Sequence, residues 1–262
     1  MSKQNFAAEK IAVIGAGAVG AATAYTIMIK NLVAEIVLVD VNEAKEEGEV
    51  MDIADGLGFA ETGSIRGGNF KDAADADIIV VTAGAAQKPG ETRLDLVKKN
   101  TKILKGIFRQ IGRLKNSSIV IIVSNPVDVL TTIAQKIIKL PRNQIFGSGT
   151  SLDTARLKNK VARYLKVNTQ SVHGYVLGEH GDSEIAAWSS VSVGGMPIHH
   201  LIKERQVLDH LAESVKKEAY EIRDYSSSPT TYDKFRNRLQ SWDKIFKAGQ
   251  KIRMQVCCFR GY

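Results

Sequence analysis

Residues 10–20 read KIAVIGAGAVG, an apolar run that ends in three glycines spaced as G-x-G-x-x-G. The run predicts a buried strand, and the following residues, 18–30, predict a helix. A second apolar run over residues 36–39 ends at Asp40, twenty residues after Gly20. Such a glycine pattern between a strand and a helix, with an acidic residue at the end of the next strand, indicates a dinucleotide site.

Each position of this pattern has a physical reason. Gly15 permits a tight turn, Gly17 lets the backbone approach a pyrophosphate, and Gly20 lets the helix pack closely on the strand. These glycines and Val19 are the predicted cofactor-binding residues, with the pyrophosphate at the positive end of the helix dipole. Asp40 would accept hydrogen bonds from ribose hydroxyls and repel a 2′-phosphate, which favours NAD over NADP. Taken alone, Asp40 is equally well explained as a turn residue.

The remaining pattern predicts an α/β protein. Strands that are continuously apolar and alternate with helices are typical of a parallel sheet covered on both faces. We predict a Rossmann-type NAD-binding domain over residues 8–147 and a mixed α+β substrate domain over residues 148–222. The apolar runs that complete the predicted sheet lie at residues 78–81, 119–123 and 145–146.

The second domain is expected to begin with a helix over residues 151–165. Residues 172–177 and 188–193 are predicted as strands, and residues 201–222 form a charged, helical pattern. Residues 223–262 are interpreted as an atypical basic tail, so that the second domain is apparently truncated. A shifted reading frame or a substituted C-terminus is the hypothesis for this tail, and the nucleotide sequence would test it.

The charge of the chain is unevenly distributed. Residues 223–262 hold nine Lys or Arg against three Asp, so this segment contributes +6 of the total net charge of +8. The basic balance therefore describes the tail, and no nucleic-acid motif accompanies it. The only cysteines are the adjacent Cys257 and Cys258, and no signal peptide or membrane span is recognisable, so a cytoplasmic location without a metal site is expected.

Two short segments, LDTAR at residues 152–156 and GEHGD at residues 178–182, supply catalytic groups. Asp153 and Arg156 are three apart on a predicted helix and share one face, while His180 lies among glycines that expose it. Alone, these would be a surface ion pair and a structural histidine. Their occurrence together with QKPGETR at residues 87–93 and SNP at residues 124–126 argues against that.

With these motifs in this order, the chain resembles the lactate/malate dehydrogenase family, most closely its bacterial L-lactate branch, from about Lys10 to Ile222. The resemblance implies that His180 is the general acid and base, oriented by Asp153, and that Arg156 binds the substrate carboxylate. It also implies that Arg93, on a loop, polarises the substrate carbonyl and that Asn125 contacts substrate or nicotinamide.

Gln87 is expected to decide the substrate. The malate enzymes of the family place an arginine at this position for a second carboxylate, and a neutral Gln offers that charge no partner. The resemblance therefore implies pyruvate and L-lactate as substrates, with malate or another 2-hydroxy acid as the alternative. It further suggests a tetramer and, through His173 and Lys158, a fructose 1,6-bisphosphate effector; a strand-end histidine and a solvated lysine are the simpler interpretation.

Two readings from other classes stay open. The chain is alternatively a catalytically silent or impaired NAD-binding remnant, which would bind NADH without oxidising it. A polyanion binder acting through the basic tail is the other, and salt-dependent DNA retention would test it.

Overall fold

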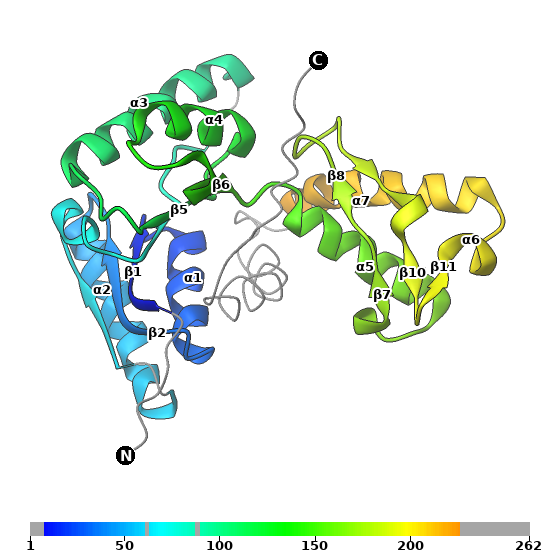
Figure 1. The fold of residues 1–262 in the computed structure, drawn as a ribbon, viewed down its shortest axis with the longest axis horizontal. Helices are drawn as coiled ribbons and strands as arrows, with labels where there is room; N and C mark the ends of the chain where they lie inside the picture. Colours follow the sequence, from blue (N-terminus) through cyan, green and yellow to red (C-terminus); the bar gives the residue numbers. More distant parts are fainter. Residues whose placement is uncertain (1–7, 61–62, 87–89, 226–262) are drawn as a thin grey trace. The chain divides into compact units, whose positions relative to one another are not determined.

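The computed structural model of the chain describes residues 8–60, 63–86 and 90–225 (Figure 1). These residues divide into two compact units at the bond between Gly147 and Ser148. Unit 1 is the part before this bond and unit 2 the part after it. Among the described residues, no helix is both long and apolar enough to cross a membrane.

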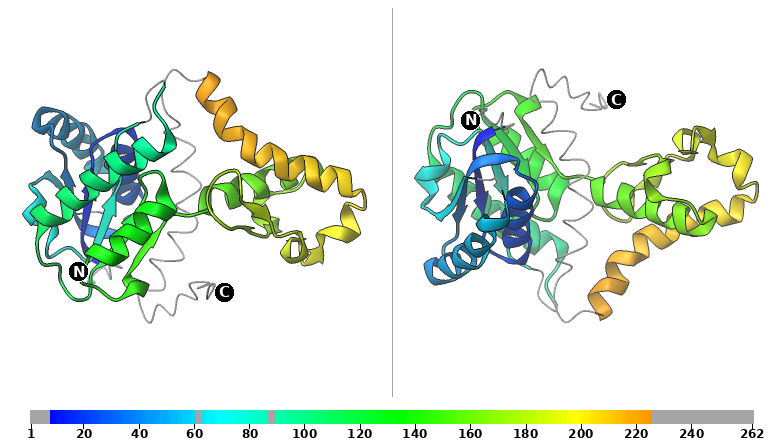
Figure 2. Two further views of the ribbon diagram at one scale, coloured as in Figure 1. Left: turned by 90° about the horizontal axis from the view of Figure 1, so that it is seen from above. Right: turned by 90° about the horizontal axis from the view of Figure 1, so that it is seen from below.

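Unit 1 is built on a six-stranded parallel sheet with the strand order β3-β2-β1-β4-β5-β6 (Figures 1 and 2). This order is that of the Rossmann fold, so the predicted fold class is confirmed. The strands are β1 (Ala8–Ile14), β2 (Val33–Val39), β3 (Ser64–Gly67), β4 (Ile78–Val81), β5 (Ile119–Ile122) and β6 (Ile145–Gly147). The main helices are α1 (Ala18–Ile29), α2 (Glu43–Ala54), α3 (Arg93–Ile111) and α4 (Val127–Ile137).

The central strands of the sheet are buried on both faces because each contains a continuous apolar run, such as residues 11–14 of β1 and residues 36–39 of β2. Alternate residues of each strand face opposite sides, and one set packs on α3 and α4: Ala12 and Ile14 of β1 share a core with Leu104 of α3 and Leu130 of α4. The intervening residues, such as Ile11 and Val13, are equally buried. This is why the strands show no polar alternation in sequence.

The strand order reverses between β1 and β4. The chain proceeds from β1 outward to β3 and then returns to β4, which pairs with the other side of β1. At such a point the connections leave the sheet in opposite directions, and the carboxyl ends of the two strands border a crevice. The fold therefore places the glycine-rich turn after β1 where a dinucleotide binds in this architecture.

Unit 2 is a small α+β unit. Its core joins apolar residues of α5 and α7, including Leu157, Val161, Leu211 and Val215, with valines of its short strands. Two antiparallel sheets, β11-β10-β7 and β8-β9, complete it. The elements are α5 (Ser151–Leu165), β7 (Val172–His173), β8 (Val176–Leu177), β9 (Ile185–Ala186), β10 (Ser192–Val193), β11 (Met196–Pro197), α6 (Ile198–Leu201) and α7 (Arg205–Tyr225).

Two of the predicted strands are wrong in detail. Residues 172–177 form two separate strands, β7 and β8, that belong to different sheets. The break falls at Gly174, where a Cβ atom would lie only 2.7 Å from a side-chain carbon of Val191. Of residues 188–193 only Ser192 and Val193 form a strand, because Trp188–Ser190 is a 3-10 turn.

Candidate active site

The glycine-rich turn after β1 is fixed by backbone geometry. Gly15 has a φ of 109°, which side-chain-bearing residues rarely adopt. A Cβ atom on Gly20 would lie 1.6 Å from the carbonyl oxygen of Gly15, so only glycine lets α1 start this close to β1. The geometry of the turn therefore explains why glycine is needed at both positions, and their role in cofactor binding stays a prediction.

The start of α1 suits an anionic group. Its N-cap is Gly17, which provides no side-chain cap, and its first turn holds no acidic residue. A Cβ atom on Gly17 would meet no atom within 4 Å, so the space beside this residue at the start of the helix is open. Amide groups left uncapped at a helix N-terminus are a ready site for a phosphate, and the residues present therefore fit the pyrophosphate of a dinucleotide. Val19 is partly buried in the first turn of α1.

Asp40 follows β2 and is held in position by its neighbours. Its carboxylate accepts hydrogen bonds from the backbone N–H groups of Ala16, at 2.7 Å, and Asn42, at 2.9 Å. Its own N–H donates to Glu46 at 2.7 Å. Each carboxylate oxygen has a second lone pair, so Asp40 can fasten the glycine turn and still accept from ribose hydroxyls.

Asn125 lies just after β5 and is exposed, with a cis peptide bond to Pro126. Its carbonyl oxygen accepts a 2.7 Å hydrogen bond from the side chain of Asn100 on α3. Asn100, which the sequence reading missed, also exchanges two hydrogen bonds with the backbone of Ala85. Asn100 lies on the buried face of α3, four residues before Leu104. A polar residue at a buried helix position is the feature of the sequence that could have identified it.

Arg93 lies elsewhere than predicted, because it is the first residue of α3 rather than part of a loop. Thr92 caps the helix and forms a capping box with Asp95. The Arg93 side chain is exposed. Gln87, the predicted substrate-selecting residue, lies outside the described residues.

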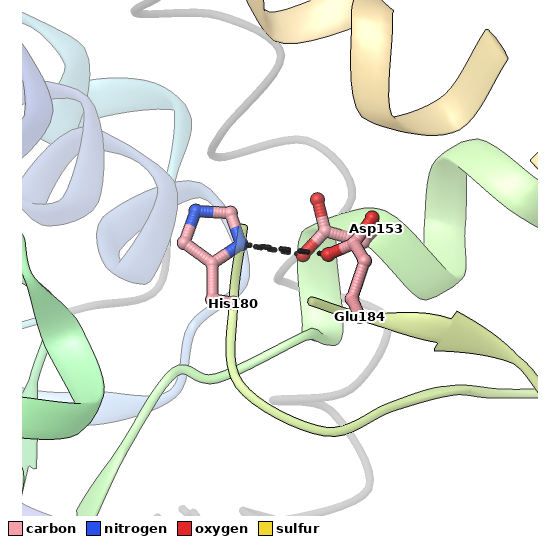
Figure 3. Close-up of side chains that lie close together, drawn as sticks. All are labelled: Asp153, His180 and Glu184. Atoms are coloured by element: carbon pink, nitrogen blue, oxygen red, sulfur yellow. Dashed lines mark hydrogen bonds and ion pairs between the residues drawn. The ribbon is translucent and has the colours of Figure 1, made fainter. Parts of the chain in front are cut away.

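Unit 2 brings together the three residues that the sequence predicted as catalytic neighbours. Asp153 lies in the first turn of α5, and its Oδ2 accepts a 2.6 Å hydrogen bond from Nδ1 of His180 (Figure 3). Burial alone would raise the pKa of Asp153, but the hydrogen bond from His180 and the charges of His180 and Arg156 outweigh it, so the pKa is lowered. An ionised carboxylate only accepts, which places the proton of the pair on Nδ1 and identifies Nε2 as the nitrogen for proton exchange.

Arg156 is a buried guanidinium rather than a surface charge. Only 3% of its side chain and 3% of the Asp153 side chain are exposed, and Nη1 of Arg156 lies 3.3 Å from Oδ1 of Asp153. Glu218 of α7 lies 3.7 Å from Nε and is also bound by Lys160 at 2.8 Å. Within the described part of the chain, the buried Nε makes no hydrogen bond. A buried donor of this kind suits an anionic ligand, such as a carboxylate.

The segment that carries His180 is fastened on two sides. Thr150, the N-cap residue of α5, donates to the carbonyl oxygen of Val176 at 2.7 Å, and Thr154 of α5 accepts from the N–H of Val176 at 3.0 Å. From α7, Lys216 donates to the carbonyl oxygen of Asp182 at 2.9 Å. The ring of His180 is therefore carried by a turn whose ends are tied to both helices of the unit 2 core.

Glu184 is a second residue near the site, besides Asn100, that was not predicted from the sequence. Only 3% of its side chain is exposed, one of its carboxyl oxygens lies 4.0 Å from Nδ1 of His180, and Figure 3 shows it beside Asp153. Burial, followed by the negative charge of Asp153, raises the pKa of Glu184 to about 7. One ligand atom from each of these three side chains lies within 4.8 Å of the others. Two of these side chains, His180 and Asp153, are already joined by a hydrogen bond, an arrangement that suits proton transfer.

The structure gives less support to the predicted effector site at His173 and Lys158 than to the cluster around His180. His173 is exposed on β7, where its backbone pairs with Ser192. The amino group of Lys158 lies over the ring of Tyr175, 5.9 Å from its centroid. The lysine is thus engaged in a cation–π contact.

A Rossmann unit with an uncapped helix start, joined in one chain to a unit in which a partly exposed histidine is hydrogen-bonded to a buried Asp–Arg pair, defines an NAD-dependent oxidoreductase. The family model for the lactate/malate dehydrogenase NAD binding domain matches residues 9–147, and the model for the alpha/beta C-terminal domain of the same family matches residues 150–232. The chain belongs to the lactate/malate dehydrogenase family. The second match runs past Ile222, where the sequence reading had placed the end of the resemblance.

Several proteins are similar to the chain over most of its length. An L-lactate dehydrogenase of Acetivibrio thermocellus is 46% identical over 220 residues, which are 82% of this chain and 69% of that protein. An L-lactate dehydrogenase of Lactococcus lactis subsp. cremoris is 46% identical over 221 residues, 82% of this chain and 70% of that protein. The solved structure of a minor L-lactate dehydrogenase from Enterococcus mundtii has a TM-score of 0.86 and 40% identity, covering 92% of this chain and 78% of that one.

Proposed function

We propose that the chain is an NAD-dependent L-lactate dehydrogenase that interconverts pyruvate and L-lactate. The observation that carries this proposal is the cluster of unit 2, in which a carboxylate orients the imidazole of His180 next to a buried guanidinium. The similarity to L-lactate dehydrogenases over 82% of the chain supports it.

In the proposed reaction, Arg156 binds the carboxylate of pyruvate through two parallel hydrogen bonds. His180, protonated, donates the proton on Nε2 to the keto oxygen, and Asp153 holds Nδ1 and stabilises the imidazolium before the transfer. Bound NADH supplies the hydride that reduces the keto carbon. In the direction of lactate oxidation, neutral His180 takes the hydroxyl proton back.

Three residues of unit 1 are assigned by family resemblance. Arg93 would polarise the keto group, Asn125 would hydrogen-bond to substrate or nicotinamide, and Gln87 would face the methyl group of pyruvate. The cofactor residues are those of the glycine turn, with Asp40 on the adenosine ribose. A homotetramer and a fructose 1,6-bisphosphate effector at His173 and Lys158 stay predictions; the second is tested by whether this sugar phosphate lowers the KM for pyruvate.

The test is pyruvate-dependent NADH oxidation by the purified 262-residue chain, with NADH binding measured separately. We expect turnover that His180→Gln lowers by about two to four orders of magnitude while NADH binding is retained. Oxaloacetate in place of pyruvate tests the malate alternative. NADH binding without turnover of either substrate would instead support the silent NAD-binding alternative.

A further inference from the structure

The second carboxyl group at His180 has no role in the reaction described above. Glu184 comes four residues after His180 and is buried beside the pair of His180 and Asp153. Carboxyl groups are rarely buried unless they are paired. Within the described residues, however, Oε2 of Glu184, the oxygen nearest His180, makes no hydrogen bond. Besides burial, hydrogen bonds of the Glu184 carboxyl group with the Asp153 side chain and the Gly181 backbone contribute to its shifted pKa, so the group is held against the acid–base pair.

We propose that Glu184 is a positioning residue that keeps His180 protonated at alkaline pH, and this proposal rests on the proposed function. When protonated, Glu184 is neutral, and Asp153 is the only negative charge against Nδ1. When Glu184 ionises, a second negative charge lies 4.0 Å from Nδ1. An opposite charge at this distance favours the protonated imidazole.

The charged groups around Glu184 allow its carboxyl group to hold a proton. α5 presents Asp153, with Arg156 behind it at 3.3 Å, and the turn after β8 presents His180. From α7, Glu218 reaches Arg156, while Lys216 and Tyr220 reach Asp182. Among the described residues, no lysine or arginine forms an ion pair with Glu184, and the charged groups that act on it are those of Asp153 and His180.

Ionisation of Glu184 falls in a useful range. Burial raises its pKa to about 7. As the pH rises past this value, Glu184 becomes negative, and its charge 4.0 Å from Nδ1 favours the protonated imidazole that pyruvate reduction needs. The alkaline limb of pyruvate reduction is thereby displaced to higher pH. By the same charge, the acid limb of lactate oxidation, which needs neutral His180, is also displaced to higher pH.

The experiment measures kcat/KM in both directions between pH 5 and 10 for the parent chain, Glu184→Gln and Glu179→Gln. In Glu184→Gln we expect both limbs to move to lower pH by about one unit or more. Glu179→Gln is the matched control, because it removes an exposed carboxylate from the same turn, and its limbs should stay near those of the parent. Limbs that are unchanged in Glu184→Gln, or that move equally in Glu179→Gln, would overturn the proposal.

An NMR titration of the His180 ring separates this proposal from the proposed function. The His180 signal is identified by its loss in His180→Gln, and its titration midpoint should be lower in Glu184→Gln than in the parent, whether or not the chain turns over pyruvate. An equal midpoint in a Glu184→Gln protein that gives a folded spectrum would contradict the role of Glu184. A lower midpoint in Glu184→Gln than in the parent, in a chain that does not turn over pyruvate, would support the role of Glu184 while refuting the dehydrogenase activity.

Discussion

Two carboxyl groups lie against the same imidazole, and their different surroundings give them opposite ionisation behaviour. Asp153 receives the hydrogen bond from His180 and lies beside Arg156, which together outweigh its burial and lower its pKa. Glu184 is equally buried but lies nearest to another negative charge, which adds to the effect of burial and raises its pKa. Residue type alone therefore does not decide which carboxyl group is ionised at neutral pH; the neighbours do.

The raised pKa of Glu184 predicts a pH-dependent stability. The pKa is about 7 in the folded chain against 4.5 as the ordinary value, so between these values the folded state keeps a proton that the unfolded state has released. Unfolding becomes more favourable as the pH rises through this window, by up to about 3 kcal/mol. Glu184→Gln removes this dependence, so its melting temperature should rise relative to that of the parent from pH 5 to pH 8. A constant difference across this range would show that Glu184 ionises normally.

Gln87 leads to a prediction about substrate choice. Gln87→Arg would provide a partner for the second carboxylate of oxaloacetate and leave a charge without a partner when pyruvate binds. Because an unpaired charge in such a site costs several kcal/mol, the ratio of kcat/KM for oxaloacetate to that for pyruvate should rise about a hundredfold or more. Gln87→Met, which stays neutral, is the control and should not reverse the preference. An unchanged ratio in Gln87→Arg would remove Gln87 from the substrate site.

At the scale of elements, α3 does more than cover the sheet. Through Asn100 it fixes two connections that leave the carboxyl edge of the sheet: Ala85, after β4, and Asn125, after β5. Ser124 adds a hydrogen bond of 2.6 Å to the carbonyl oxygen of Ala83. These bonds hold together backbone segments that are far apart in the chain, so the edge of unit 1 that faces a nucleotide is set by side chains as well as by strands.

Asn100→Ala should therefore destabilise unit 1. The substitution removes three hydrogen bonds to partly buried backbone groups of Ala85 and Asn125, at a cost of about 1–3 kcal/mol in the free energy of unfolding. Denaturant unfolding measured by circular dichroism checks this value. Gln110→Ala is the control on the same helix, because Gln110 is exposed and bonds only within α3; it should change the free energy by about 0.5 kcal/mol or less. Equal effects of the two substitutions would contradict the role of Asn100.

The sequence predicted the strands of unit 1 that contain a continuous apolar run and missed β3, which has none. β3 was missed because only Ile65 of its four residues is buried and Arg66 interrupts the pattern, as is common in a strand at the edge of a sheet. Residues 172–177 look like one strand, but the close approach of Val191 to Gly174 divides them. Such a break depends on packing between separate segments, and the glycine at position 174 is its mark in the sequence.

The candidate site divides in the same way. His180, Asp153 and Arg156 were predictable because their motifs combine reactive residue types with fixed spacing, and the structure brings all three together. Glu184 and Asn100 act through burial and through partners distant in the chain, and a single Glu or Asn carries no mark of either in the sequence. Interactions that depend on tertiary packing are the part that sequence patterns do not reveal.

At the scale of the whole molecule, the two units have separate hydrophobic cores. One core joins the sheet of unit 1 with α3 and α4, and the other joins α5, α7 and the short strands of unit 2. The two cores share no residue. The nucleotide-binding features lie in unit 1, whereas the acid–base pair lies in unit 2, so binding of the cofactor and protonation of His180 report on different parts of the chain.

This division predicts where NAD⁺ stabilises the chain. A ligand that binds only the folded state at 100 times its Kd adds about 2.7 kcal/mol to the free energy of unfolding, and the open helix start after Gly17 places that effect in unit 1. In hydrogen exchange under mild denaturant, amides of β1 and β4 should exchange about a hundredfold more slowly with NAD⁺, while amides of α5 and α7 change little. NADP⁺ at the same concentration is the control, and its added phosphate beside Asp40 should give much weaker protection. Equal slowing in both units would show that they unfold as one cooperative body, and no slowing in β1 and β4 would remove the dinucleotide from the glycine turn.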